Sequence, residues 1–215
     1  MESNSLKKRM LNLKHEHVSN PKYETFSLKS GVASVDLRAN MPPIWDQGDL
    51  GSCVAFALCA SFQYCDPSFD GSQLFLYYNS RYLDYLSGDN SVSIDDGTTL
   101  SQGIRALTQY GLCGNSNWPY DVSRFAIKPP QNCYDEGLNH QIISATNVQQ
   151  TLDQMQACLQ AGYPFVIGIL VFSSFFNDNT GVIPYPNTYR ENILGGHAIC
   201  VCGYDDASQR FLVRN

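Results

Sequence analysis

The chain has 215 residues, of which 43% are hydrophobic, and a formal net charge of −6 at pH 7. A chain of this size can bury a substantial core, as one compact unit or as two subdomains around a cleft. The acidic balance and a basic cluster limited to Lys7–Arg9 and Lys14 argue against a nucleic-acid partner. The sequence has no apolar stretch of about 18 residues, so we expect neither a transmembrane helix nor a membrane partner.

The N-terminal region, residues 1–33, differs in composition from the rest of the chain. It is polar, rich in lysine and serine, and has few apolar anchors before Tyr23 and Phe26. We therefore interpret it as an N-terminal extension. Its first residues lack the apolar core of a secretory signal, so we expect a cytoplasmic or other reducing compartment.

The next region, about residues 34–128, is predicted to be mainly helical. Residues 53–65 are apolar on nearly every face, which is typical of a helix buried in a domain centre. Residues 73–86 carry apolar side chains at three- and four-residue spacing and predict a second helix that ends at Ser87. A third helix begins near Leu100 and ends before Gly111.

The last region, about residues 129–215, is predicted to be mainly β-structure. A helix over residues 152–161 precedes the apolar run 164–172, which predicts a buried strand. Further strands are predicted at 197–204 and 210–214. The fold class is therefore α+β, with a subdomain boundary near residues 128–130 and a cleft between the two parts.

Four residues have the types and order that nucleophilic catalysis by a thiol requires. Cys53 opens the first predicted helix, and a helix N-terminus beside an imidazolium favours the reactive thiolate. His197, in the sequence Gly-Gly-His-Ala, is suited to accept and return the proton, and Asn215 to orient the imidazole. The amide of Gln47 and the backbone N–H of Cys53 are suited to stabilise an oxyanion.

This pattern resembles the papain and cathepsin family of cysteine peptidases, whose catalytic order is Gln, Cys, His, Asn. The resemblance covers roughly residues 35–215, and His197 follows Cys53 at the family's spacing of about 130–150 residues, which Asn215 slightly exceeds. Further matches to the family are Val35–Arg38, Gln109–Gly111, Trp118–Tyr120 and Gly203–Asp205.

The resemblance implies a papain-like peptidase domain over residues 34–215, with a helical left subdomain, an antiparallel β-barrel-like right subdomain and the active site in the cleft between them. It implies hydrolysis of peptide or protein substrates through an acyl-enzyme on Cys53. It assigns substrate contacts to Gly97 and Ala198. It also implies that residues 1–33 are a propeptide that lies through the cleft and inhibits the enzyme, although a simple surface arm explains their composition equally well.

The sequence departs from the family at several positions. Leu50 replaces a cysteine that normally forms a disulfide, and Val54 replaces an aromatic residue after the nucleophile. The family's substrate-binding glycine pair is reduced to Gly97. The family continues past its asparagine with Ser-Trp and further strands, so the end at Asn215 indicates a truncated, processed or divergent C-terminus.

Other interpretations of these residues remain open. Cys53 and His197 taken singly are typical of core residues, and Gln47 is also suited to cap its loop. A papain-like fold also serves acyl or peptidyl transfer, or acts as a catalytically silent binding module.

The remaining cysteines do not indicate a metal site or a disulfide scaffold. Cys200 and Cys202 share a strand face, but two cysteines without companion ligands are too few for a metal site. We expect most of the eight cysteines to be buried free thiols. The sequence has no glycine-rich phosphate loop, so we infer no cofactor and no metal.

Overall fold

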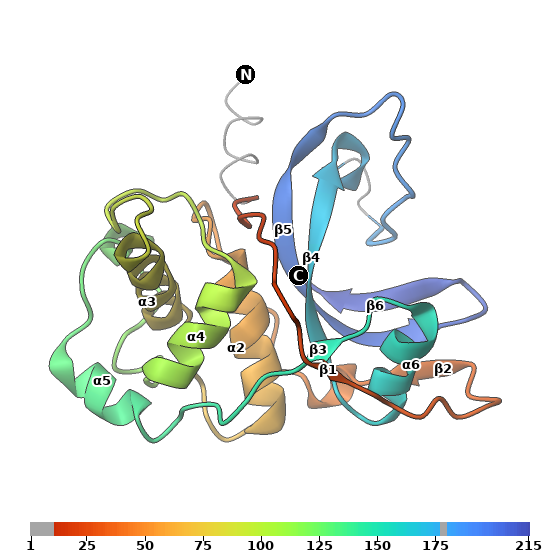
Figure 1. Ribbon diagram of the computed structural model, residues 1–215, viewed down its shortest axis with the longest axis horizontal. Helices are drawn as coiled ribbons and strands as arrows, with labels where there is room; N and C mark the ends of the chain where they lie inside the picture. Colours follow the sequence, from red (N-terminus) through yellow and green to blue (C-terminus); the bar gives the residue numbers. More distant parts are fainter. Residues whose placement is uncertain (1–10, 177–179) are drawn as a thin grey trace.

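The computed structural model describes residues 11–176 and 180–215. A helical half and a sheet half lie side by side, with the N-terminal arm, residues 11–33, running between them from the top of the view (Figure 1). The helical half contains α2 (Cys53–Cys65), α3 (Gln73–Leu86), α4 (Leu100–Gln109), α5 (Gln131–Gly137) and the short 3-10 helix η2 (Val122–Arg124). The sheet half contains α6 (Leu152–Gln160), the strands, and the 3-10 helices η1 (Arg38–Asn40) and η3 (Ser173–Phe176).

The long strand β5 (Ile193–Asp205) organises the sheet half. It pairs antiparallel with β4 (Phe165–Phe172), β6 (Arg210–Arg214) and the short β2 (Ser34–Asp36). A separate parallel pair joins β1 (Tyr23–Glu24) of the arm to β3 (Asn147–Val148). The four-stranded sheet is therefore antiparallel, as predicted, and the arm is attached to the sheet half by a parallel strand pair.

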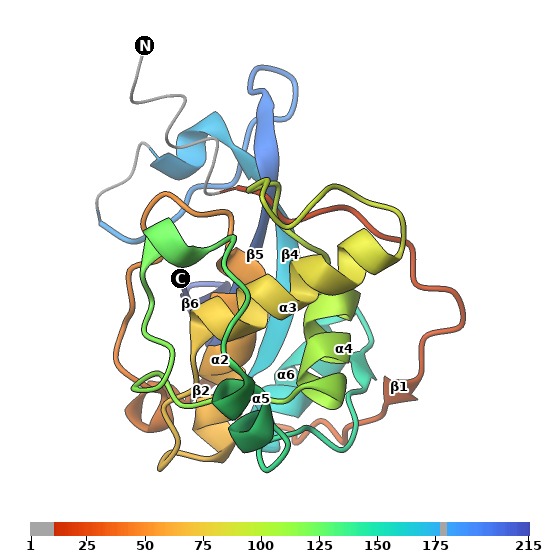
Figure 2. The same cartoon turned by 90° about the vertical axis from the view of Figure 1, so that its left-hand side faces the viewer.

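The predicted helices at 53–65 and 73–86 are confirmed with the same bounds. Their local signals explain this agreement: Ser72 caps α3 by accepting a hydrogen bond from Phe75 N–H, and Ser87 follows its last residue. Gly103 lets α4 approach α2, because a Cβ there would lie 2.5 Å from a methyl carbon of Leu58. In the view from the helical side, α3 and α4 lie in front of β4 and β5 (Figure 2).

The apolar run that forms β4 is less buried than its sequence predicts, so the interpretation as a buried strand is wrong for most of its length. Phe165 and Val171 are buried, but Leu170 is 58% exposed. The physical reason is that successive side chains of a strand point to opposite faces: Gly168 and Leu170 share the exposed face, and Phe165 and Val171 lie on the other. An apolar run predicts burial but does not reveal which face stays uncovered.

The chain also crosses between the halves more often than a boundary near residue 128 implies. The early strand β2 pairs with the end of β5 in the sheet half. The late helix α5 packs on the helical half, where a Cβ on Gly137 would lie 2.3 Å from the carbonyl oxygen of Tyr110. The boundary near residues 128–130 remains a prediction of where the mainly helical and the mainly β parts of the sequence meet.

All eight cysteines are free, and seven of them are buried, which confirms the expectation of buried thiols. Ala198 of β5 belongs to the same apolar core cluster as α2 and α3, so the core of the helical half reaches across to the sheet. Among the described residues, no helix combines the length and apolar character needed to cross a membrane.

Candidate active site

Cys53 is the first residue of α2. It is 1% exposed. The loop that leads to it is held by Tyr120, whose hydroxyl donates to the carbonyl oxygen of Gln47 at 2.8 Å and lies 2.7 Å from the hydroxyl of Ser52. Tyr120 therefore fixes both ends of the loop that presents the thiol.

The environment of the thiol combines burial with backbone donors. Burial raises the pKa of Cys53, while hydrogen bonds from the backbone of Ala198, Val54 and Asn12 act to lower it, and the net shift is upward. Val54 belongs to the same helix, Ala198 follows His197 on β5, and Asn12 belongs to the arm. The helix, the sheet and the arm therefore each contribute backbone that favours the ionised form of the thiol.

His197 lies on β5 and is 3% exposed. Its Nε2 atom is 2.5 Å from Oδ1 of Asn215, which holds the ring. Its Nδ1 atom is buried and has no hydrogen-bond partner among the described residues. Burial lowers the pKa of His197, and the bond to Asn215 raises it by less, so the neutral imidazole is favoured.

Asn215 is held through the residue before it. Arg214, at the end of β6, donates to the carbonyl oxygens of Pro42 (2.6 Å) and Pro43 and stacks over Trp45 with its guanidinium carbon 4.9 Å from the ring centre. This anchor ties the end of the strand to the helical side of the chain. Asn215 is thereby positioned against His197.

Gln47 lies in the loop before Cys53 and is 9% exposed. Its Nε2 atom donates to the carbonyl oxygen of Leu50 at 2.9 Å, so the side chain supports the loop it belongs to. An amide NH₂ carries two donors, and the role of Gln47 at an oxyanion remains a prediction.

Gly97 and Ala198 lie where the arm crosses the site. Gly97 has φ of +77°, and a Cβ there would lie 1.7 Å from the carbonyl oxygen of Asn12, so only glycine permits this approach. Ala198 is 3% exposed and lines a cavity of about 20 Å³ together with Trp45 and Asn215. The structure thus brings Cys53, His197, Asn215, Gly97 and Ala198 into one region.

The arm crosses this region as extended backbone and bridges the two halves. Leu13 N–H donates to the carbonyl oxygen of Gly196 at 3.0 Å, and Lys14 N–H donates to that of Thr98 at 3.1 Å. The arm has few apolar residues before Tyr23, but two of them anchor it: Leu11 is 5% exposed, and Leu13 packs against the core of the helical half. These anchors depend on partners far away in the sequence.

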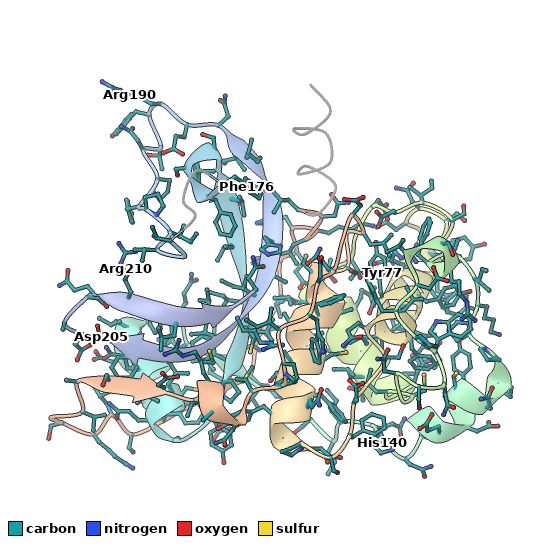
Figure 3. The ribbon with its side chains drawn as sticks, turned by 180° about the vertical axis from the view of Figure 1, so that it is seen from behind. Tyr77, His140, Phe176, Arg190, Asp205 and Arg210 are labelled. Carbon is teal, nitrogen blue, oxygen red and sulfur yellow. The ribbon has the colours of Figure 1, made fainter. Side chains whose placement is uncertain are left out.

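Asp95 is a residue of this region that the sequence reasoning missed. Its two carboxylate oxygens lie 3.1 and 3.2 Å from the N–H of Gly51, and the hydroxyl of Tyr77 donates to it. Tyr77 comes from the interior of the helical half (Figure 3). Asp95 therefore ties the loop before Cys53, at the residue after Leu50, to the loop that carries Gly97.

Comparisons with known proteins agree with this geometry. The Peptidase_C39 like family matches residues 91–215, more than half of the chain. A peptidase C1-like protein of Acanthamoeba polyphaga mimivirus is 32% identical over 79% of this chain, and the chain spans 58% of that relative's length.

Two solved structures extend the comparison to the fold. Xylellain, a cysteine protease from Xylella fastidiosa, matches with a TM-score of 0.82 at 31% sequence identity. The match covers 97% of this chain and 84% of the xylellain chain. The procathepsin B S9 structure from Trypanosoma congolense matches with a TM-score of 0.70 at 17% sequence identity. The match covers 98% of this chain and 76% of the procathepsin chain. The second likeness concerns the fold alone. The chain belongs to the papain-like cysteine peptidase family.

Proposed function

We propose that this chain is a cysteine-type peptidase that hydrolyses peptide bonds with Cys53 as nucleophile and His197 as general acid and base. One observation carries the proposal. Asn215 holds Nε2 of His197, while Nδ1 is buried without a partner among the described residues. The backbone of Ala198, the next residue along β5, acts to lower the pKa of Cys53. An imidazole fixed at one nitrogen and unpaired at the other is suited to exchange a proton with the thiol.

The reaction follows from these groups. The Cys53 proton moves to Nδ1 of His197, and the sulfur attacks the substrate carbonyl carbon to form a tetrahedral oxyanion. The Cys53 N–H and the Gln47 amide stabilise this oxyanion. The C–N bond then breaks as His197 returns the proton to the leaving amine, which leaves a thioester on Cys53. Water, losing a proton to His197, attacks the thioester carbonyl and releases the acid product and the thiol.

Substrate backbone would lie between Gly97 and Ala198. The arm supports this assignment, because its own backbone occupies that position and bonds to Gly196 on one side and Thr98 on the other. A peptide substrate bound in the same way would pass over the thiol as an extended strand.

Residues 11–14 would then act as an inhibitory segment. They cross the site as backbone, since Asn12 pairs with Gly196 and Leu13 pairs with Thr98. The fold match to procathepsin B covers 98% of this chain, so it extends over the arm. This supports a comparison of the arm with the corresponding part of a proenzyme.

The ionisation of the covered site also supports inhibition. Burial raises the pKa of Cys53 and lowers the pKa of His197, so both groups are kept neutral. A neutral thiol is a poor nucleophile. Departure of the arm would admit water to both groups, which weakens the desolvation that disfavours the ion pair.

The test measures hydrolysis of internally quenched peptides by three proteins. The first is the full chain, and the second is the double variant Leu13→Asp with Lys14→Glu, which removes two anchors of the arm. The third is that double variant with Cys53→Ala added. We expect at least about tenfold faster hydrolysis after arm displacement and none after loss of the thiol. Val18→Asp is the matched control, because Val18 is an exposed arm residue at 43% exposure. Hydrolysis that persists in Cys53→Ala would contradict the proposed function, and equal rates with and without displacement would contradict only the inhibitory role.

A further inference from the structure

Lys14, the arm residue after Leu13, is held by two ion pairs in addition to its backbone hydrogen bond. The Nζ atom of Lys14 lies 2.7 Å from Oδ2 of Asp89 and 3.1 Å from Oδ2 of Asp96. Its backbone N–H is bonded to Thr98 beside the proposed substrate strand. The arm therefore shows how the cleft accommodates an extended peptide whose side chain next to the apolar Leu13 is cationic.

The carboxylates belong to a loop whose shape is fixed independently of Lys14. Arg81, 2% exposed, donates from α3 to the carbonyl oxygens of Val92 and Ile94 within this loop. The Nδ2 atom of Asn90 donates to Oδ2 of Asp96 at 2.6 Å. A loop fixed in this way keeps both carboxylates in place when the arm is absent.

The electrostatics fit a permanently charged occupant. Burial alone would lower the pKa of Lys14, but the bonds to Asp89 and Asp96 raise it, and the net shift is upward. Asp84, 5% exposed and bonded to the hydroxyl of Thr98 at 2.6 Å, adds negative potential behind the pair. The lysine side chain is only 22% exposed, so the site desolvates part of the cation that it binds.

We infer that Asp89 and Asp96 form a substrate subsite for a lysine or arginine side chain, placed two residues along the peptide from the residue that lies over Cys53. The inference rests on the proposed peptidase function and adds a specificity to it. In the resting chain Lys14 occupies the subsite, and in the active enzyme a basic substrate residue next to an apolar one takes its place.

The expected preference is moderate because the pair is partly exposed. Two ion pairs of this kind correspond to about fivefold in kcat/KM over an uncharged side chain of similar length. The preference falls as salt rises, because ions screen partly exposed pairs. A merely structural role of the two carboxylates would give neither the charge selectivity nor the salt dependence.

The experiment uses the full chain carrying Leu13→Asp with Lys14→Glu in every sample. Internally quenched peptides contain one Lys-Leu or one Leu-Lys pair in an alanine background, and matched peptides carry norleucine in place of lysine. Cleavage positions are read by mass spectrometry. The rates of the Leu13→Asp, Lys14→Glu protein are compared with those of the same protein carrying Asp89→Asn, or both Asp89→Asn and Asp96→Asn. The control carries Asp153→Asn, on α6, instead.

A preference of about fivefold for one lysine peptide, lost in Asp89→Asn with Asp96→Asn and kept in Asp153→Asn, is the expected result. Equal cleavage of lysine and norleucine peptides, or a preference that both aspartate substitutions leave intact, would overturn the subsite. If no peptide is cleaved, the peptidase proposal fails. Fluorescence anisotropy of labelled peptides on Cys53→Ala in the same background then decides the subsite: tighter lysine binding that needs both aspartates supports it, and equal or absent binding overturns it.

Discussion

The helical half holds Cys53 at the N-terminus of the buried helix α2. The sheet half holds His197 on β5, where some residues of β5 and of the adjacent β4 are exposed. Leu76, on the helix that packs against α2, is fully buried. On the sheet side, Leu170 of β4 is 58% exposed and Ile193 at the start of β5 is 56% exposed. The nucleophile is thus positioned by packing, while the histidine depends on a hydrogen bond to Asn215 and on the anchor of Arg214.

This difference separates two kinds of sensitivity. Core substitutions in the helical half should cost stability, because close-packed side chains leave cavities when they are truncated. Substitutions around His197 should cost activity first, since the imidazole orientation depends on few contacts. The predictions below follow from this contrast.

The largest effect is expected at the nucleophile itself. Cys53→Ala should lower kcat in the arm-displaced chain by at least about a thousandfold, because alanine has no thiol with which to form the proposed acyl-enzyme. The free energy of unfolding should change by less than about 1 kcal/mol, since the side chains are similar in size. Peptide hydrolysis and urea unfolding check the two parts, and activity retained above one tenth would remove Cys53 from the mechanism.

A pair of leucines tests the contrast in packing. Leu76→Ala in α3 should destabilise the protein by about 3 kcal/mol, whereas Leu170→Ala in β4 should cost less than about 1 kcal/mol. Urea denaturation measures both values. Equal losses would show that the two halves are packed alike and would break the comparison.

Loss of the orienting asparagine should act on the rate. Asn215→Ala should lower kcat by about thirtyfold with little change in KM, because a misplaced imidazole still binds substrate but transfers its proton less well. Asn215→Asp should recover part of the rate by accepting the same hydrogen bond. A rise in KM at unchanged kcat would contradict an orienting role.

The smallest effect is expected at the tether that joins the two loops of the helical half. Tyr77→Phe removes one donor to Asp95 and should cost about 1.5 kcal/mol of stability. Activity in the arm-displaced chain should fall less than threefold, because the Gly51 bond to Asp95 remains. Thermal unfolding measures the stability and a peptide assay measures the activity. An unchanged melting temperature would show that the Tyr77 hydrogen bond to Asp95 does not stabilise the protein.

Much of the fold could be predicted from the sequence because its signals are local. An apolar run bounded by Asp66 and Pro67 defines α2, and Ser72 and Ser87 bracket α3. Cys53, His197 and Asn215 could be proposed as site residues because their types and order match one chemistry, and the structure places Nε2 of His197 2.5 Å from Oδ1 of Asn215. In each case the information lies within a few residues or in a known order along the chain.

The features that escaped prediction depend on contacts between distant segments. Asp95 meets Gly51 across 44 positions, and nothing in either local sequence marks the pair. The burial of Leu11 requires β5 as a partner, and the exposure of Leu170 follows from its place on an uncovered strand face, which apolar character does not reveal.

The measurement that tests the central claim most directly is the rate of Cys53 alkylation by iodoacetamide as a function of pH, followed by mass spectrometry. In the full chain, burial holds the pKa of Cys53 above its ordinary value of 9.0. Alkylation should therefore rise only as the pH increases beyond that value. In Leu13→Asp with Lys14→Glu, the thiol should pair with His197 as thiolate and imidazolium, and alkylation should already be fast at about pH 6. The same pH profile in both proteins, with Cys53 slow at neutral pH, would contradict an activated thiol held back by the arm.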